Sequence, residues 1–329
     1  MIKTLTIQNL RGIQKLTLDN LGQFNLFIGK NNCGKTTILE GLYIWAGAPV
    51  PNSVLSTNTT RNMPLNSESV PQLFNNSMMD TPIRVITDAG TKEERTVEVE
   101  GTKEAFPEIF NANLHNEIPM FSVYYKDKTG YAKTIYRENG DYSEHYAHVR
   151  KVSYYNANIN FYDISKQVSS IIIEKGKDKV IKILQMVDPA IRDFQMINGN
   201  SIMFDIGAPK LVSLQVMGDG IRRLLAIIST IKTVENSIML VDEIDNGLHH
   251  TVMDILWKAV FAACREYNVQ LFATTHSYEC IQSFKDNLAD DRNSDASVIR
   301  IERNGEIHKA VTMDMGDLQT MFENNWEIR

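Results

Sequence analysis

The feature that most constrains the fold is the segment 24–37, where a short apolar strand leads through a glycine-rich loop into a helix. The residues Phe24 to Ile28 are apolar apart from Asn25. The next eight residues read Gly-Lys-Asn-Asn-Cys-Gly-Lys-Thr and match the pattern G-x-x-x-x-G-K-[ST]. Apolar residues at helical spacing follow from Lys35 onward. Because strand, loop and helix come in the order that phosphate binding requires, we interpret the segment as a phosphate loop rather than a chance match on a glycine turn.

The residue types of this loop suit the binding of nucleotide phosphates. Backbone N–H groups of the loop and of the helix N-terminus form a nest for anions. Glycine permits backbone geometry that a Cβ atom would block. Lys35 supplies a positive charge at the β- and γ-phosphates, and the hydroxyl of Thr36 is a ligand for Mg²⁺. The residues expected around the nucleotide are Gly29, Asn31, Asn32, Cys33, Gly34, Lys35, Thr36 and Thr37.

A second apolar strand, 238–241, ends in two acidic residues, Asp242 and Glu243. We expect Asp242 to hold the Mg²⁺ shell opposite Thr36, and Glu243 to polarise the attacking water as general base. A solvated strand end is the simpler alternative. A third apolar strand, 269–274, is followed by His276, which we expect to hydrogen-bond the γ-phosphate. The expected catalytic residues are Glu243, Lys35 and His276, and the expected metal ligands are Thr36 and Asp242.

The hydrophobic pattern of the whole chain predicts a mixed α/β fold. A polar segment with four prolines over 47–80 predicts a long loop. We expect helices over 35–43, 163–195, 219–234, 251–267 and 277–287, and strands over 2–8, 13–18, 83–87, 94–100, 120–126, 131–137 and 150–156, with hairpins over 201–215 and 297–310. The alternation of strands and helices after residue 218 predicts a parallel sheet covered by helices.

Composition narrows the class of protein. The 329 residues carry 40 acidic and 34 basic side chains, and most of the acid excess lies in 286–329. This is not the basic balance of a protein that coats nucleic acid by charge. The three cysteines form no metal-binding or disulfide pattern. Because the sequence shows neither a leader peptide nor an apolar run of about 18 residues, we expect a cytoplasmic protein without a membrane partner.

Four segments together resemble the ABC-type ATPase heads of the SMC, RecF and overcoming-lysogenization-defect (OLD) groups. They are LTIQNLRGI through the phosphate loop (Walker A), IMLVDEIDNGLHH (Walker B and D-loop), LFATTHS (switch histidine) and VMGDGIRRLLAII at the position of the signature motif. The small bacterial AAA15/AAA21 ATPases are the most similar group. The resemblance covers 1–45 and 150–285. It implies a P-loop NTPase with a mixed central sheet, an antiparallel β subdomain and a helical lobe, and it implies ATP as the nucleotide.

The resemblance also implies an active site shared between two copies of the chain. Such heads form head-to-tail homodimers around two ATP molecules, so Gly218, Asp219 and Gly220 would face the partner's γ-phosphate, where the start of a helix suits an anion. Two residues depart from the pattern. Gly218 stands where many relatives have serine, and His249 falls near the usual D-loop aspartate. Arg11 resembles an arginine near the nucleotide, although a solvated turn residue is an equal alternative.

The resemblance divides the single head into five segments. They are a Walker A lobe (1–45), a polar loop and β-rich insert (46–149), a strand with a helical lobe (150–217), the lobe with signature, Walker B and switch histidine (218–287), and an acidic hairpin and tail (288–329). The best match for the Q-loop is Asn156–Asn158. We expect the insert or the acidic tail to dock a partner protein.

Several functions fit such a head. The first is an ATP-driven switch that controls a separate effector, a nuclease or a toxin, in bacterial anti-phage defence; the residues after 287 are too few for a nuclease module of their own. The second is a RecF-like DNA-repair ATPase, against which the acidic balance counts. A structural SMC clamp would need a long coiled coil, which 161–212 cannot supply. The ATPase subunit of a transporter is the fourth alternative. The N-terminal segment with Asn-Leu-Arg-Gly and the Walker B segment are more similar to the SMC and OLD groups than to transporter subunits.

Two further residue groups invite alternative interpretations. Cys33 lies inside the phosphate loop, which suggests a redox switch without other support. His249 and His250, with Asp242 and Asp245, suggest a metal site, although contacts of a head dimer are the preferred interpretation.

Overall fold

The computed structural model describes residues 1–48, 51–63, 69–101, 119–137, 140–143, 150–155, 161–198, 201–289, 295–313 and 315–323. The chain forms two compact units. The first contains Met1–Gly22, Phe27–Val152 and Ser297–Met313, and the second contains Gln23–Leu26, Ser153–Ala296 and Asp314–Arg329. The expected site Asn156–Asn158 for the Q-loop lies outside the described residues.

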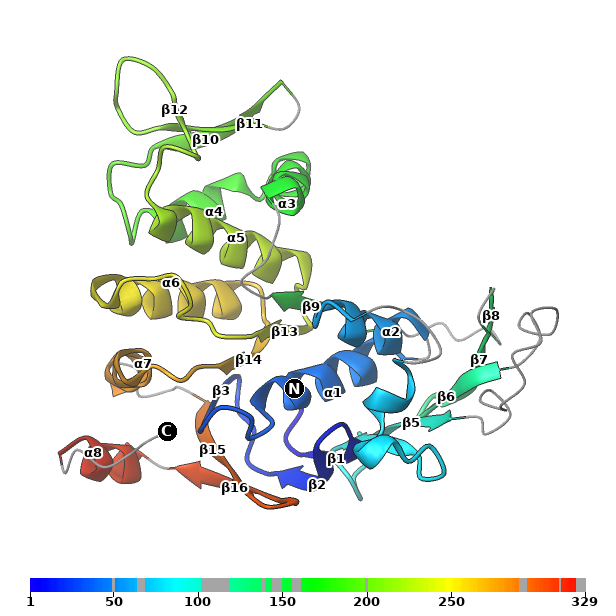
Figure 1. The fold of residues 1–329 in the computed structure, drawn as a ribbon. Coiled ribbons are helices and arrows are strands. Elements are labelled where there is room, and N and C mark those ends of the chain that lie inside the picture. The colour runs from blue at the N-terminus through cyan, green and yellow to red at the C-terminus, as the bar shows by residue number, and fades with distance from the viewer. Residues whose placement is uncertain are drawn as a thin grey trace. The chain divides into compact units, whose positions relative to one another are not determined.

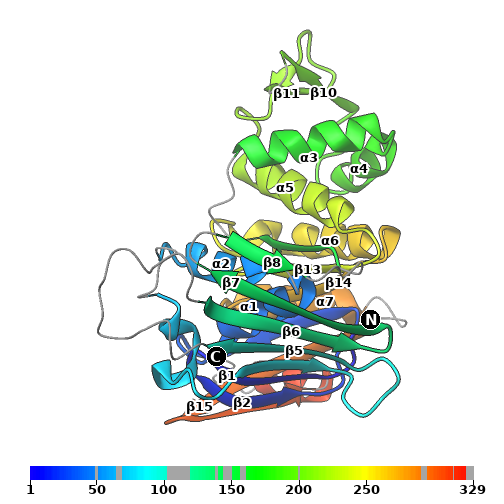
Figure 2. The same ribbon diagram turned by 90° about the vertical axis from the view of Figure 1, so that its right-hand side faces the viewer.

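The first unit is built on a seven-stranded antiparallel sheet with the strand order β2-β1-β4-β5-β6-β7-β8 (Figure 2). Alternate side chains of its strands are buried, as the period-2 pattern predicts. Helix α1 (Lys35–Gly47) packs against β1, β4 and β5. The strands are β1 (Leu5–Leu10), β2 (Ile13–Leu18), β4 (Ile83–Thr87), β5 (Arg95–Gly101), β6 (Pro119–Asp127), β7 (Gly130–Arg137) and β8 (Gly140–Ser143).

One buried cation joins this sheet to α1. Arg95, 3% exposed, lies over the rings of Trp45 and Tyr125, with its Cζ at 4.6 and 4.3 Å from the ring centroids. It also donates to the carbonyl of Ala48 at the end of α1. Cation–π contacts and a hydrogen bond thus compensate the desolvation of the guanidinium.

The segment 47–80 is where the prediction of a long loop is wrong. It contains helix α2 (Pro51–Thr59) and two short 3₁₀ helices, η1 (Pro71–Leu73) and η2 (Asn75–Ser77). Proline at the first position suits a helix start, because its missing N–H is unbonded there in any helix. Asn58 is fully buried, and its side-chain amide is satisfied there because it accepts from Arg11 and donates to Ser69. Polar residues that bond one another inside the fold account for the polar sequence.

Glu40 of α1 is the centre of this network. Its Oε2 accepts from Arg11 Nε at 2.8 Å, and its Oε1 accepts from Arg61 Nε at 2.6 Å. The Glu40 side chain is 1% exposed, so the two guanidinium groups compensate the cost of burying its carboxylate. Arg11 in addition donates to the carbonyl of Thr57. The network ties the phosphate-loop helix to the β1–β2 turn and to α2.

Strand β3 (Phe24–Ile28) contributes residues to both units. In the first unit the strand order is β16-β15-β3, and β15 (Ala296–Asn304) and β16 (Ile307–Met313) form the expected C-terminal hairpin. In the second unit the order is β3-β14-β13-β9, with β9 (Val152–Tyr155), β13 (Ile238–Val241) and β14 (Gln270–Thr274). The strands β13 and β14 are parallel, as the alternation of elements predicts.

The second unit is otherwise mostly helical (Figure 1). Helix α5 (Asp219–Thr233) packs against α3 (Phe161–Ile173), α4 (Lys177–Leu184) and α6 (Met253–Glu266), which follows η4 (His250–Val252). Helices α7 (Tyr278–Ala289) and α8 (Met315–Glu323) also contact each other. A three-stranded sheet has the order β10-β11-β12, with β10 (Asp193–Ile197), β11 (Ser201–Asp205) and β12 (Val212–Ser213).

The prediction of one helical stretch over 163–195 is wrong in two places. The helix breaks at Lys175, whose φ is +57°, and Gly176, and α4 starts after this break. The chain then passes Pro189 and forms β10, which pairs with β11. No helix in the described part of the chain combines the length and the apolar character that crossing a bilayer requires.

The Glu40 network predicts a large effect on stability. Replacing Glu40 with alanine leaves Arg11 buried without its carboxylate, and we expect the free energy of unfolding to fall by about 3 kcal/mol. Urea titration followed by circular dichroism measures it. Glu98→Ala in the exposed Arg84–Glu98 pair is the matched control, with an expected change of about 1 kcal/mol or less. Equal losses in both variants would contradict the role of the network.

Candidate functional site

The phosphate loop begins where β3, buried along its whole length, reaches Gly29. Gly29 has φ = +139°, and a Cβ atom there would lie 2.4 Å from the carbonyl oxygen of Ile301. Gly34, with φ = +103°, is the N-cap of α1. Both positions therefore require glycine, one for space and both for backbone conformation. The residues that sequence patterns assign to the loop thus fold as strand, turn and helix start.

The start of α1 has the chemistry of an anion site. Its N-cap makes no side-chain hydrogen bond, and the first turn contains no acidic residue. Helix N-termini present N–H groups and a positive partial charge. Lys35 folds back over the loop, where its Nζ donates to the carbonyls of Gly29 at 2.6 Å and Lys30 at 3.0 Å. A helix start with a nearby lysine and with glycines in the preceding loop suits the phosphates of a nucleotide.

Cys33 is not set up as a redox switch. The residue is 4% exposed, and burial raises the pKa of its thiol, an effect that the charge of Lys35 opposes only in part. A raised pKa lowers the fraction of thiolate, which is the reactive form. The side chain therefore behaves as part of the packed loop.

The β15–β16 hairpin brings two residues to the phosphate loop that sequence patterns do not indicate. Arg303 donates through Nη1 to the carbonyl of Asn32 at 3.4 Å. The Cδ2 atom of His308 would lie 3.4 Å from a Cβ atom at Gly34. Burial lowers the pKa of His308. Their separation from the loop by more than 270 residues explains why no local motif reveals them.

Arg11 has a structural environment in this unit. Its guanidinium bonds Glu40, Asn58 and the carbonyl of Thr57, as described above, and its side chain is 9% exposed. It is not the solvated turn residue of the simpler alternative. Its contact with the nucleotide remains a prediction.

In the second unit, Asp242 and Glu243 follow β13, and Thr274 ends the neighbouring parallel strand β14. The hydroxyl of Thr274 donates to Asp242 Oδ1 at 2.6 Å and accepts from the N–H of Glu243 at 2.8 Å. The Tyr154 hydroxyl donates to Asp242 Oδ2 at 3.2 Å. Both oxygens of Asp242 thus have hydrogen-bond donors, which fixes the carboxylate at the strand end.

Glu243 differs from Asp242 in backbone and in exposure. Its φ is +50°, in the left-handed region that a non-glycine residue seldom adopts and that stores strain. The carboxylate is half-exposed, and its Oε1 lies 3.9 Å from Nδ1 of His276. Its Oε2 accepts from Asn246 Nδ2 at 3.4 Å. The structure therefore brings together the two residues that the sequence places after neighbouring strands.

The metal interpretation of the histidine pair finds no support. Asp245 is buried and accepts from the Thr275 hydroxyl at 2.6 Å. The rings of His249 and His250 contact each other at a tilt of 40°, with centroids 4.1 Å apart. Within the described residues, no three His, Cys, Asp or Glu side chains form a group that could hold a metal ion. A Mg²⁺ site of a phosphoryl-transfer enzyme needs fewer protein ligands, because the phosphates and water complete it.

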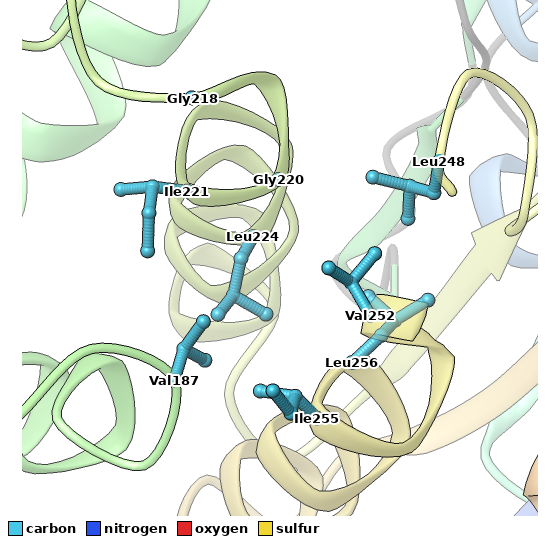
Figure 3. A pocket seen from close by; sticks show the side chains of 9 residues that line it. All are labelled: Val187, Gly218, Gly220, Ile221, Leu224, Leu248, Val252, Ile255 and Leu256. Atoms are coloured by element: carbon cyan, nitrogen blue, oxygen red, sulfur yellow. The ribbon is translucent and has the colours of Figure 1, made fainter. Parts of the chain in front are cut away.

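The signature segment forms the N-terminus of α5, with Gly218 as N-cap. A Cβ atom at Gly218 would meet nothing within 4 Å, so this end of the helix is open. Asp219 pairs with Arg222 one turn on. An apolar cavity of about 220 Å³ lies beside this turn (Figure 3). It is lined by Val187, Gly218, Gly220, Ile221, Leu224, Leu248, Val252, Ile255 and Leu256.

Comparison with known proteins is consistent with these observations. Residues 94–281 match the family model AAA_21, described as "AAA domain, putative AbiEii toxin, Type IV TA system". The chain is 25% identical over 327 residues to an "ATP/GTP phosphatase" of Helicobacter pylori, with 86% of this chain and 87% of that protein covered. A stretch of 42 residues is 50% identical to the DNA replication and repair protein RecF of Lactobacillus acidophilus, covering 13% of this chain and 11% of that protein.

Among solved structures, the fold is similar to an SMC head bound to the C-winged helix domain of ScpA. The TM-score is 0.54 at 11% identity, and 96% of this chain and 98% of that chain are covered. The likeness confirms the predicted fold class, an α/β P-loop head with a mixed sheet, an antiparallel β subdomain and a helical lobe.

Proposed function

Because the chain belongs to the AAA_21 family and is an ATPase with an SMC-like head, we propose that it runs a Mg²⁺-dependent ATP cycle on the phosphate loop and the Walker B carboxylates. The observation that carries this proposal is the contrast between the two acids after β13. Asp242 is held by Thr274 and Tyr154, whereas the Glu243 carboxylate stays half-exposed beside His276. This contrast supports a metal-ligand role for Asp242 and a proton-accepting role for Glu243, whose carboxylate is solvent-accessible.

In this mechanism each residue has one task. The N–H groups at the start of α1, with Lys35, bind the phosphates, and Asn31, Asn32, Cys33 and Thr37 complete the loop around them. Thr36 and Asp242 hold Mg²⁺, which when bound neutralises charge that builds up on the phosphates. Glu243 accepts the proton of the attacking water, and His276 donates a hydrogen bond to the γ-phosphate.

This assignment predicts separate effects for two substitutions. Lys35→Ala should abolish ATP binding, because the loop loses its cation. Glu243→Gln should keep ATP binding and lower kcat by roughly 10²–10⁴-fold, since the amide accepts no proton. Equilibrium binding of a fluorescent ATP analogue and phosphate release measure the two quantities. Hydrolysis by Glu243→Gln at the parent rate would disprove the general-base role.

We further propose that two copies of the chain form the active site together. Gly218, Asp219 and Gly220 lie at an open helix start, where the backbone suits the γ-phosphate of a partner's ATP. The absence of a serine hydroxyl at position 218 leaves backbone N–H groups as the donors. The apolar cavity beside this turn then lies at the edge of the dimer contact.

A mixing experiment tests this shared site. Lys35→Ala removes the phosphate-loop half, and Gly220→Asp places a negative charge at the signature half. Each variant alone should be inactive, whereas a heterodimer contains one composite site with both halves intact. Phosphate release measured across mixing ratios should therefore recover part of the parent rate. Absence of recovery at every ratio, with heterodimers detected by native mass spectrometry, would mean that the site is complete within one chain.

The biological role that we propose is control of a separate effector, a nuclease or toxin of anti-phage defence. Two relatives support this role: the matched family is described as a putative AbiEii toxin of a toxin–antitoxin system, and the similar SMC head is bound to another protein, ScpA. The insert 46–149 and the tail 286–329 are the proposed docking segments. The runner-up is a RecF-like ATPase that acts on DNA, which the short match to RecF favours.

Docking at these segments can be tested by substituting exposed apolar residues, which leaves the buried Glu40 network intact. Met78 and Tyr131 in the insert and Ile307 in the C-terminal hairpin are 58%, 57% and 72% exposed. Serine substitutions there should weaken co-purification with the product of the adjacent gene, whereas Ile173→Ser, 77% exposed outside both segments, should not. Undiminished capture by all variants would exclude docking at these sites. An ATPase rate stimulated by DNA alone would favour the RecF-like function.

A further inference from the structure

Arg223 connects the signature helix to the turn that carries the proposed general base. It lies one helical turn after Gly220 on α5. Its Nη2 donates to the carbonyls of Glu243 at 2.9 Å and Ile244 at 3.3 Å, and its Nη1 donates to the carbonyl of Asn246. One side chain thus bonds three carbonyls of a single turn in the same unit.

The surroundings hold this guanidinium in place. Its Cζ lies 5.8 Å from the centroid of the Tyr155 ring, and the carbonyl of Tyr155 accepts from the N–H of Asp242 at 2.9 Å. Within the described residues, Arg223 Nε is buried and finds no hydrogen-bond partner. The three hydrogen bonds to main-chain carbonyls and the contact with the Tyr155 ring are therefore the interactions that hold the guanidinium.

The turn needs such support because its backbone is strained. Glu243 is left-handed at φ = +50°, and a conformation of this kind costs about 1–3 kcal/mol and persists only where the surroundings hold it. Thr274 fixes the N–H side of Glu243, and Arg223 fixes the carbonyl side. Gly247, with φ = +73°, supplies a second left-handed residue of the turn, a conformation that glycine adopts without strain.

We propose that Arg223 is a positioning residue that holds the Glu243 turn in its reactive conformation and makes that conformation depend on the first turn of α5. This role rests on the proposed function, in which Glu243 is the base and the start of α5 contacts the partner's ATP. If the first turn of α5 shifts, the three hydrogen bonds of Arg223 change, and the position of the Glu243 carboxylate in the same chain changes with them.

The experiment combines kinetics with hydrogen exchange on the full chain. Arg223→Gln should lower kcat by roughly 10²-fold at nearly unchanged KM, because a misplaced base affects the chemical step and not binding. Arg223→Lys should retain an intermediate kcat, since an ammonium keeps the charge but cannot reproduce the planar fork. Added guanidinium at millimolar concentration should raise kcat of Arg223→Ala. Lys258→Gln, which removes an exposed charge on α6, is the control and should match the parent.

Amide exchange in peptides that cover 243–248 provides the second readout. The exchange rate of these peptides should rise in Arg223→Gln, while peptides from β13 and β14 keep the parent rates. If Arg223→Gln does not fold, Arg223→Lys is compared with the parent in the same way. Unchanged exchange in the turn would overturn the proposal, and so would a parent-like kcat alongside an inactive Glu243→Gln. Parent-like hydrolysis by Glu243→Gln would instead overturn the proposed function, and turn exchange would still decide whether Arg223 holds the turn.

Discussion

The parallel pairing of β13 and β14 is the constraint on which the candidate site depends. Parallel neighbours end at the same edge of a sheet, so residues after Val241 and after Ala273 must meet there. The Thr274 hydroxyl uses this proximity twice, as donor to Asp242 and as acceptor from the N–H of Glu243. Because Thr274 is fully buried, these two bonds are not replaced by water.

This edge gives two adjacent acids different properties. Thr274 and Tyr154 hold the carboxylate of Asp242 by hydrogen bonds, whereas Glu243 keeps an accessible carboxylate on a strained turn. In the other unit, the phosphate loop likewise combines a fixed backbone with a side chain that can bind a ligand. Gly29 and Gly34 fix the backbone, and Lys35 bonds the main-chain carbonyls of Gly29 and Lys30, which ATP phosphates can replace. In each unit, backbone geometry and hydrogen bonds hold these groups in place.

The sequence predicts the parts of the fold that local patterns determine. The phosphate loop, the strand with Asp242 and Glu243, and the helix after Gly218 all follow from spacing over a few residues, and their elements form as expected. Helix α2 could not be predicted, because its buried Asn58 and Thr57 are satisfied by Arg11, far away in sequence. The contacts of Arg303 with the phosphate loop and of Arg223 with the Glu243 turn escape prediction for the same reason: each bonds backbone carbonyls, which have no sequence signature.

A structure of the Glu243→Gln chain with ATP and Mg²⁺ would show directly whether two copies share the active site. We expect a dimer in which the β- and γ-phosphates lie in the loop 29–36, Thr36 and Asp242 share the metal, and Gly218–Gly220 of the second copy reach the γ-phosphate. An ATP molecule contacted by one chain alone, or bound with Asp242 remote from the metal, would contradict it.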